Sequence, residues 1–122
     1  MAEEKSFENK IKTYLNEQGC YFVKYFANRN TKSGIPDILA SVNGAFLAIE
    51  VKSSTGTPKP LQIHNIKKIN NSGGYAVVVA PKSFDELTEL IQSLKYLKYY
   101  EARKKVYQIN SEYAKYFYDD FF

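Results

Sequence analysis

A tight turn at Asn43-Gly44 constrains the fold of this 122-residue chain more than any other feature of its sequence. Both residues tolerate positive φ, and this dipeptide between apolar runs is the strongest short-range signal for a two-residue β-hairpin. The sequence therefore predicts strands over residues 37–42 and 45–52, one on each side of the turn. A turn of this length also fixes which residues of the two strands face each other.

The predicted register brings charged side chains together at the open end of the hairpin. Counting outward from Val42 opposite Ala45, Asp37 falls opposite Glu50. Successive side chains alternate between faces, so Glu50 and Lys52 share a face, and Asp37 shares it because paired residues point the same way. Two carboxylates with Cβ atoms about 5 Å apart repel each other, and a cation between them reverses that effect. The pattern therefore predicts a divalent cation site, with Lys52 able to reach a phosphate oxygen or an attacking water.

An alternative interpretation treats these three residues as ordinary surface groups. Asp37 follows Pro36 at a turn, and Glu50 and Lys52 would then lie on a solvated strand face. Residues 45–49 are apolar, however, which is typical of a covered central strand. Charges rarely stand at the end of such a strand without a partner. The functional interpretation is therefore favoured.

The remaining segments predict one domain over residues 1–122, of the α/β class. Helices are expected over residues 3–18, from Pro60 to the glycines at 73–74, and after a capping box of Ser83 and Glu86; further strands are expected over residues 21–26 and 75–80. A helix between the third and fourth strands makes them parallel, so the expected fold is a central mixed sheet flanked by helices. Its core is expected over about residues 5–95.

The segment 96–122 is expected to be an extension that is partly helical. Its basic residues alternate with tyrosines, which suits either a phosphate backbone or a solvated helix with a buried aromatic side. It ends in the aromatic residues Tyr113, Phe117, Tyr118, Phe121 and Phe122. So many exposed aromatic side chains would be costly in a monomer, so we expect this segment to be a homodimer contact.

Glu8 is a further candidate, on the first predicted helix. It lies in line with Ile11 and Leu15, at spacings of three and seven residues, and so points toward the fold. The alternative is a surface ion pair with Lys12 one turn later. Spacing alone leaves both interpretations open.

Composition excludes several classes of protein. No apolar run approaches the ~20 residues of a membrane span, and the N-terminus lacks the apolar region of a signal peptide. We therefore expect an intracellular protein with no membrane association. The single cysteine, Cys20, excludes an intramolecular disulfide, and the single histidine, His64, excludes a paired-histidine metal site.

The net charge of +4 mildly favours a polyanionic partner. The basic residues are nearly all lysines, which suit phosphate contact better than base recognition. The residues expected to contact DNA are Arg29, Lys32, Lys59, Lys67 and Lys68.

Two sequence runs together resemble the signature of the PD-(D/E)xK nucleases. These are Gly34-Ile35-Pro36-Asp37-Ile38 and, after the hairpin turn, Ile49-Glu50-Val51-Lys52-Ser53. With Glu8 and Gln62, the pattern most resembles the VRR-NUC branch in a minimal stand-alone form such as phages carry. Archaeal and RecU-type Holliday junction resolvases look like relatives. The resemblance covers about residues 5–81 and implies a restriction-endonuclease-like αβββαβ core.

The resemblance implies an endodeoxyribonuclease that depends on Mg²⁺ or Mn²⁺. Asp37 and Glu50 would bind the metal together with the backbone carbonyl of Val51, and Lys52 would position or activate the attacking water. Glu8 would bind metal through water or a second ion. Gln62 would orient Lys52 or the substrate, and its alternative role is a polar cap of its helix.

The expected substrate is branched DNA such as a Holliday junction, and this expectation rests on the resemblance alone. A nicking or restriction-type nuclease is the closest alternative, although 122 residues leave no room for a recognition domain. A DNA-binding module that does not cut is another, although a binder gains little from two acids facing phosphate. RNA as the substrate stays open, and so does a phage protein acting in the host cytoplasm.

Overall fold

The computed structural model describes residues 2–26 and 30–117. Its sheet has the strand order β1 (Tyr21–Lys24), β2 (Ile38–Val42), β3 (Ala45–Val51) and β4 (Tyr75–Val79). The β1–β2 and β2–β3 pairs are antiparallel, and the β3–β4 pair is parallel. The predicted mixed sheet and the parallel crossover are therefore confirmed.

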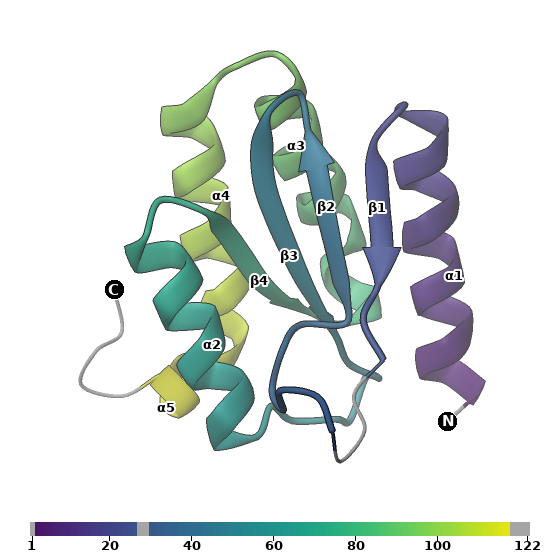
Figure 1. Ribbon diagram of the computed structural model, residues 1–122, viewed down its shortest axis with the longest axis vertical. Helices are drawn as coiled ribbons and strands as arrows, with labels where there is room; N and C mark the ends of the chain where they lie inside the picture. Colours follow the sequence, from purple (N-terminus) through teal and green to yellow (C-terminus); the bar gives the residue numbers. More distant parts are fainter. Residues whose placement is uncertain (1, 27–29, 118–122) are drawn as a thin grey trace.

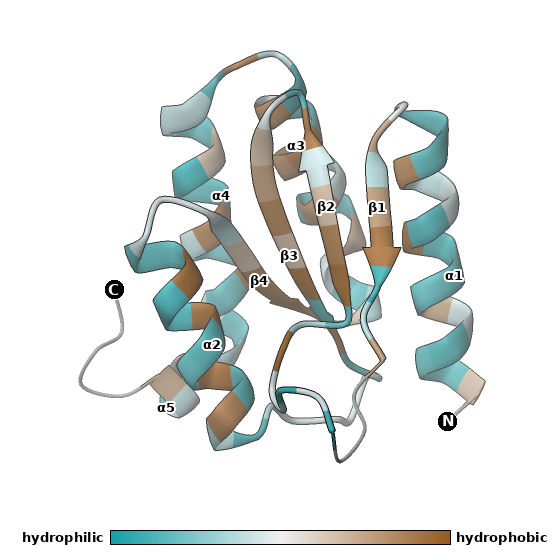
Figure 2. Ribbon diagram, viewed as in Figure 1, coloured by the Kyte–Doolittle hydropathy of each residue, from teal (hydrophilic) through white to brown (hydrophobic). Residues whose placement is uncertain are grey.

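Helices cover both faces of this sheet (Figure 1). They are α1 (Ala2–Glu17), α2 (Pro60–Asn71), α3 (Phe84–Lys95), α4 (Tyr99–Asn110) and the short α5 (Ala114–Phe117), with 3-10 turns at Pro81–Ser83 and Ser111–Tyr113. The larger hydrophobic cluster joins one face of the sheet to α1, α3 and α4, and the smaller one joins the other face to α2 and α5. Hydrophobic residues accordingly concentrate on the strands, whereas the helices show many hydrophilic residues (Figure 2). This arrangement is a restriction-endonuclease-like α/β fold.

The hairpin has the predicted turn and register. Asn43 and Gly44 both adopt positive φ, at 47° and 89°. Val42 pairs with Ala45, and the pairing continues to Ile38 opposite Ile49. Local turn chemistry therefore fixes the alignment of the two strands that lead to the site.

Three predicted details at element ends are wrong. The strand predicted to begin at Asp37 begins at Ile38, and the one predicted to reach residue 26 ends at Lys24. The capping box of Ser83 and Glu86 is absent, because a 3-10 turn precedes α3 and gives Ser83 a φ of −101° and a ψ of 12°. An N-cap residue needs an extended backbone to turn its side chain onto the helix.

Side chains cover the free edge of β4. Asn110 accepts a hydrogen bond from the Val78 N–H at 2.9 Å and donates one to the Ala76 carbonyl at 3.0 Å. Asn70 pairs in the same way with both backbone groups of Ala76. Arg103 donates to the Gly74 carbonyl at 2.8 Å. Backbone groups that would otherwise invite another strand are thus satisfied within the chain.

The C-terminal segment is part of the hydrophobic core. Ala102, Val106 and Ile109 of α4 are buried in the larger cluster, and Phe117 is fully buried in the smaller one. The expectation of an exposed aromatic tail is therefore wrong for Phe117, because the face of the sheet beside α2 covers it. Tyr118, Phe121 and Phe122 lie outside the described residues. Within residues 2–26 and 30–117, no helix is long and apolar enough to cross a membrane.

Candidate active site

The predicted charged residues meet at one end of the sheet, where β1 and β3 end and β2 begins (Figure 1). Asp37 immediately precedes β2, Glu50 is the second-last residue of β3, and Lys52 follows that strand. Lys24, the last residue of β1, joins them. The order of strands thus gathers residues that lie up to 28 positions apart in the chain.

Asp37 is held toward β3 by its side chain and toward β1 by its backbone. Its Oδ2 accepts a hydrogen bond from the Val51 N–H at 2.8 Å, and its Oδ1 lies 3.4 Å from Lys24 Nζ. Its backbone carbonyl accepts the Tyr25 N–H at 2.8 Å. The carboxylate therefore lies between the ends of β1 and β3.

The loop before Asp37 packs tightly against α2. Gly34 adopts a φ of +78°, and a Cβ at this position would lie 2.7 Å from Leu61 Cγ and 2.8 Å from Asn65 Nδ2. A side chain here would meet both backbone strain and a steric clash. The glycine of the Gly-Ile-Pro-Asp run thus allows the close approach that sets the path of the chain into Asp37.

Glu50 is buried, with 2% of its surface exposed. Its Oε2 accepts a hydrogen bond from Gln62 Nε2 at 2.9 Å and lies 3.5 Å from Lys52 Nζ. Its Oε1 is buried and has no hydrogen-bond partner among the described residues. Burial, and then the negative charge of Asp37, raises the pKa of Glu50 to about 8, against the opposing charge of Lys52.

Lys52 is the other buried charge of the site, with 9% of its surface exposed. Its backbone N–H donates to the Val79 carbonyl at 2.9 Å, which extends the parallel pairing by one residue beyond β3. Glu50 and Lys52 therefore lie on the same side of a fixed backbone, as the alternation predicts.

Gln62 forms the helix cap that was its alternative prediction, and it also contacts a site residue. Its Oε1 accepts the Lys59 N–H at 2.8 Å at the start of α2, and its Nε2 contacts Glu50. The side chain is thus a helix cap that also holds a site residue. Its partner in the site is Glu50, where the prediction named Lys52 or the substrate.

Glu8 points into the fold, as its helical spacing predicts, and has only 4% of its surface exposed. It forms the alternative ion pair with Lys12, at 2.8 Å, and a second pair with Lys24, also at 2.8 Å. Burial raises the pKa of Glu8, but the two lysines together outweigh this and hold the pKa below its ordinary value.

Lys24 was missed by the sequence analysis. The signal that identifies it is the alternation in β1, which places Lys24 on the same face as the partly buried Phe22. A lysine on the inner face of a strand needs an acidic partner. Glu8 and Asp37 are those partners.

The residues at this end of the sheet fit a hard divalent cation. The unpartnered Glu50 Oε1 is a buried oxygen that an ion would satisfy. Among the described residues, no three His, Cys, Asp or Glu side chains come close enough together to hold an ion. Mg²⁺ is commonly bound through one or two carboxylates, with water and substrate oxygens completing its coordination.

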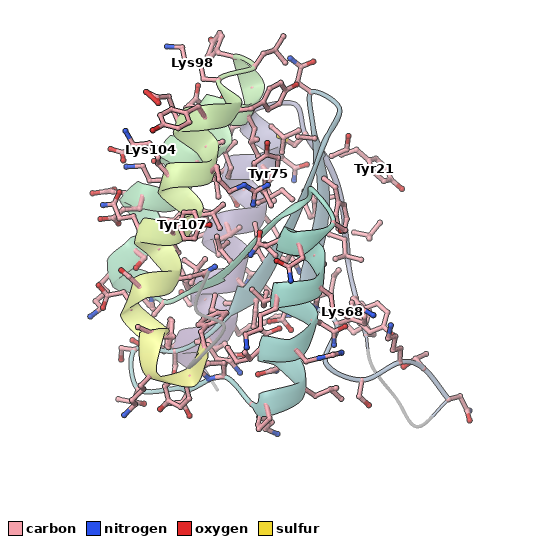
Figure 3. All side chains as sticks on the ribbon, turned by 90° about the vertical axis from the view of Figure 1, so that its left-hand side faces the viewer. Tyr21, Lys68, Tyr75, Lys98, Lys104 and Tyr107 are labelled. Atoms are coloured by element: carbon pink, nitrogen blue, oxygen red, sulfur yellow. The ribbon has the colours of Figure 1, made fainter. Side chains whose placement is uncertain are left out.

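The basic residues expected at a DNA surface are exposed or partly exposed where the structure describes them. Lys32, Lys59 and Lys68 are exposed, Lys67 is partly exposed, and Arg29 lies outside the described residues. Lys98 immediately precedes α4 and Lys104 lies on it, whereas Lys68 lies on α2 on the other side of the view (Figure 3). Lys98 and Lys104 therefore lie apart from Lys68.

The fold belongs to the restriction-endonuclease-like class. The family model of the archaeal Holliday junction resolvase (Hjc) matches residues 2–115, which is nearly the whole chain. The chain therefore belongs to the archaeal Holliday junction resolvase (Hjc) family, within the PD-(D/E)xK nuclease superfamily. The resemblance to that superfamily is confirmed, and the family is one of DNA-binding nucleases. Comparison with curated proteins and with solved structures finds no match.

Proposed function

We propose that this protein is a divalent-metal-dependent DNA endonuclease that cuts Holliday junctions and similar branched DNA. Family membership supports the substrate class. The observation that carries the proposal is the buried Glu50, next to Asp37 and Lys52 at one end of the sheet, with an Oε1 that has no hydrogen-bond partner within residues 2–26 and 30–117. Two acids and a lysine in this position suit hydrolysis of a phosphodiester.

Asp37, Glu50 and the backbone carbonyl of Val51 are the proposed holders of Mg²⁺ or Mn²⁺. In a strand, the N–H and C=O of one residue point to the same side, and the Val51 N–H reaches Asp37. The Val51 carbonyl is therefore directed toward Asp37 as well. When bound, the ion would polarise the phosphate and lower the pKa of a bound water.

Lys52 would act on the phosphate or on the attacking water. Its ammonium lies 3.5 Å from Glu50 Oε2, at the end of a buried stem. From there it would donate hydrogen bonds that stabilise the negative charge developing as water displaces the leaving oxygen in line. No covalent enzyme intermediate is needed.

Gln62 is proposed as a positioning residue. Because its amide is fixed at both ends, by the Lys59 N–H and by Glu50, it holds the buried acid in one orientation. The predicted role of Glu8 in metal binding, through water or a second ion, is untested and is not needed for this mechanism. Lys32, Lys59, Lys67 and Lys68 are proposed to contact the DNA backbone.

A homodimer is part of the proposal, because symmetric cutting of a four-way junction requires two active sites on one substrate. Exposed apolar side chains lie together on the open face of the sheet, where Tyr21 and Phe46 both pair with Ser41 and Val23 lies beside them. This face is the proposed dimer surface. Light scattering should give a dimer for the wild type and a monomer for Phe46→Glu; a monomeric wild type would contradict it.

The finer likeness to the VRR-NUC branch, a phage origin and an intracellular location stay predictions. None of them is needed for the proposed chemistry, which depends on the residues at the end of the sheet.

Cleavage of a DNA panel tests the function. The panel holds a four-way junction, a flap, a linear duplex and a single strand, each with Mn²⁺ or with EDTA. We expect junction cleavage with Mn²⁺ only, reduced about 100-fold or more in Asp37→Asn and Lys52→Ala. Lys82→Ala, which removes an exposed lysine paired with Glu112, is the control and should cut normally.

Other results would redirect the assignment. Cleavage that survives EDTA or the Asp37 substitution would overturn the proposed mechanism. Binding without cutting would favour the DNA-binding module, and equal cutting of linear duplex would favour a nicking or restriction-type nuclease.

A further inference from the structure

We propose that Lys24 takes the place of a second divalent cation between Glu8 and Asp37, so that the site holds one metal ion per chain. This inference rests on the proposed function, because it concerns the same site. It assigns a positioning role to a residue outside the motifs, and it makes Glu8 the counter-ion of a lysine instead of a metal ligand.

The Lys24 ammonium lies between two carboxylates. It lies 2.8 Å from Glu8 Oε1 and 3.4 Å from Asp37 Oδ1, and its side chain is 20% exposed. It therefore sits between a helix carboxylate and a site carboxylate. Two carboxylates at this spacing would repel each other if no positive charge lay between them.

Each carboxylate oxygen of Glu8 lies next to a different lysine. Oε1 contacts Lys24, and Oε2 lies 2.8 Å from Lys12. Both oxygens of this buried acid are thus already compensated by lysine charges, as a buried carboxylate requires. For Glu8 to bind a metal directly, Lys24 would have to leave its position.

The two sides of Asp37 differ in how their charges are matched. Its Oδ1 faces Lys24 and its Oδ2 accepts the Val51 N–H, whereas on the far side Glu50 Oε1 has no partner among the described residues. Glu8 Oε2 likewise has no hydrogen-bond partner among the described residues, but Lys12 Nζ lies 2.8 Å from it. The demand for a further cation is therefore on the Glu50 side. A divalent ion on the other side would meet a lysine charge at contact distance.

A purely structural role for Lys24 makes a different prediction. If Lys24 only ties α1 to the end of β1, replacing it weakens the fold but leaves the number of bound ions unchanged. Lys12 offers a matched comparison, because it also pairs with Glu8 but belongs to α1 and is not among the partners of Asp37.

The test is the number of Mn²⁺ ions bound per chain, measured by electron paramagnetic resonance of free Mn²⁺ during titration of the full chain without DNA. We expect one ion for the wild type, for Lys12→Ser and for the conservative Lys24→Arg. Lys24→Ser should bind a second ion, and the added Glu8→Gln substitution should remove it. Two ions in the wild type, or one ion in a folded Lys24→Ser, would overturn the proposal.

Two further arms keep the inference separate from the proposed function. Mn²⁺ binding that is absent in the wild type, or unchanged in Asp37→Asn and Glu50→Gln, would contradict the proposed metal site itself. Should Lys24→Ser fail to fold by circular dichroism, Glu8→Gln decides: an unchanged single ion supports the inference, and a fall from two ions to one refutes it.

Discussion

The Val51 N–H donates to Asp37 Oδ2 at 2.8 Å, so a side chain joins the start of β2 to the end of β3 where the backbone ladder stops. This hydrogen bond fixes the distance between the loop that carries Asp37 and the strand that carries Glu50. A site acid is thereby held in position before any ion or substrate arrives.

Substitutions of Asp37 should separate its charge from this structural bond. Asparagine keeps an oxygen that can accept the Val51 N–H, so Asp37→Asn should fold normally while losing cleavage. Asp37→Ala removes the acceptor as well and should lower the free energy of unfolding by a further ~1–2 kcal/mol. Urea denaturation of both variants measures the difference, and equal stability would contradict a structural role for the bond.

The pKa of Glu50 predicts how stability depends on pH. Burial and the charge of Asp37 raise this pKa from 4.5 to about 8, so the folded chain holds a proton that the unfolded chain releases between these values. The stabilising effect of that proton is complete below the unfolded pKa and is lost as pH rises through the folded pKa. The metal-free protein should therefore be less stable at pH ~8 than at pH ~5 through this group.

Glu50→Gln isolates that dependence, because the amide does not titrate. It should flatten the fall in stability and raise the free energy of unfolding near pH 8 by roughly 1–3 kcal/mol. Glu101→Gln, at an exposed site on α4, is the control and should follow the wild type. Parallel curves for wild type and Glu50→Gln would show that the buried acid is not the source of the dependence.

Gly34→Ala should destabilise the protein and reduce cleavage. The new Cβ would lie within 3 Å of both Leu61 and Asn65, at a φ of +78°. We expect a loss of about 1–3 kcal/mol in thermal unfolding. Gly19→Ala is a close control, because Gly19 has a φ of +75° but no atom within 4 Å of its added Cβ. Equal losses in the two variants would mean that backbone strain alone, and not the contact with α2, fixes the loop.

Asn110→Ala tests whether α4 is part of the domain. Asn110 is fully buried, and its amide satisfies the Val78 N–H and the Ala76 carbonyl at the edge of β4. Its removal leaves buried polar groups without their partner and should cost about 2–4 kcal/mol. Gln108→Ala, on the exposed side of the same helix, should cost little. A small effect for Asn110→Ala, measured by urea denaturation, would contradict the account.

The sequence predicts the centre of the fold well because the decisive signals there are local. The Asn43-Gly44 turn sets the pairing of its own neighbours, and the alternation of side chains then brings Glu50 and Lys52 to one face. Asp37 was placed next to Glu50 by the same counting. The sequence did not predict that Asp37 would lie just before β2 and not within it. The Val51 N–H donates to the Asp37 side chain, and this bond depends on where β3 ends.

The missed features are non-local. Lys24 is identified as a site residue by its contacts with Glu8, 16 residues away in the sequence, and with Asp37, 13 residues away. No local turn brings these residues together, so the sequence alone does not predict the contacts. Phe117 was expected at an interface because its sequence neighbours are aromatic, but the surface it covers belongs to α2 and the sheet. A segment rich in aromatic residues is expected to be buried. Only the packing of the whole chain decides whether another chain or the chain's own sheet and helices cover it.

The most direct measurement of the central claim is the position of a bound ion in crystals of the protein soaked in Mn²⁺. An anomalous difference map should place one peak about 2.1 Å from oxygens of both Asp37 and Glu50. A peak at any other location, or the two carboxylates turned away from a common ion, would contradict the assignment of this end of the sheet as a nuclease active site.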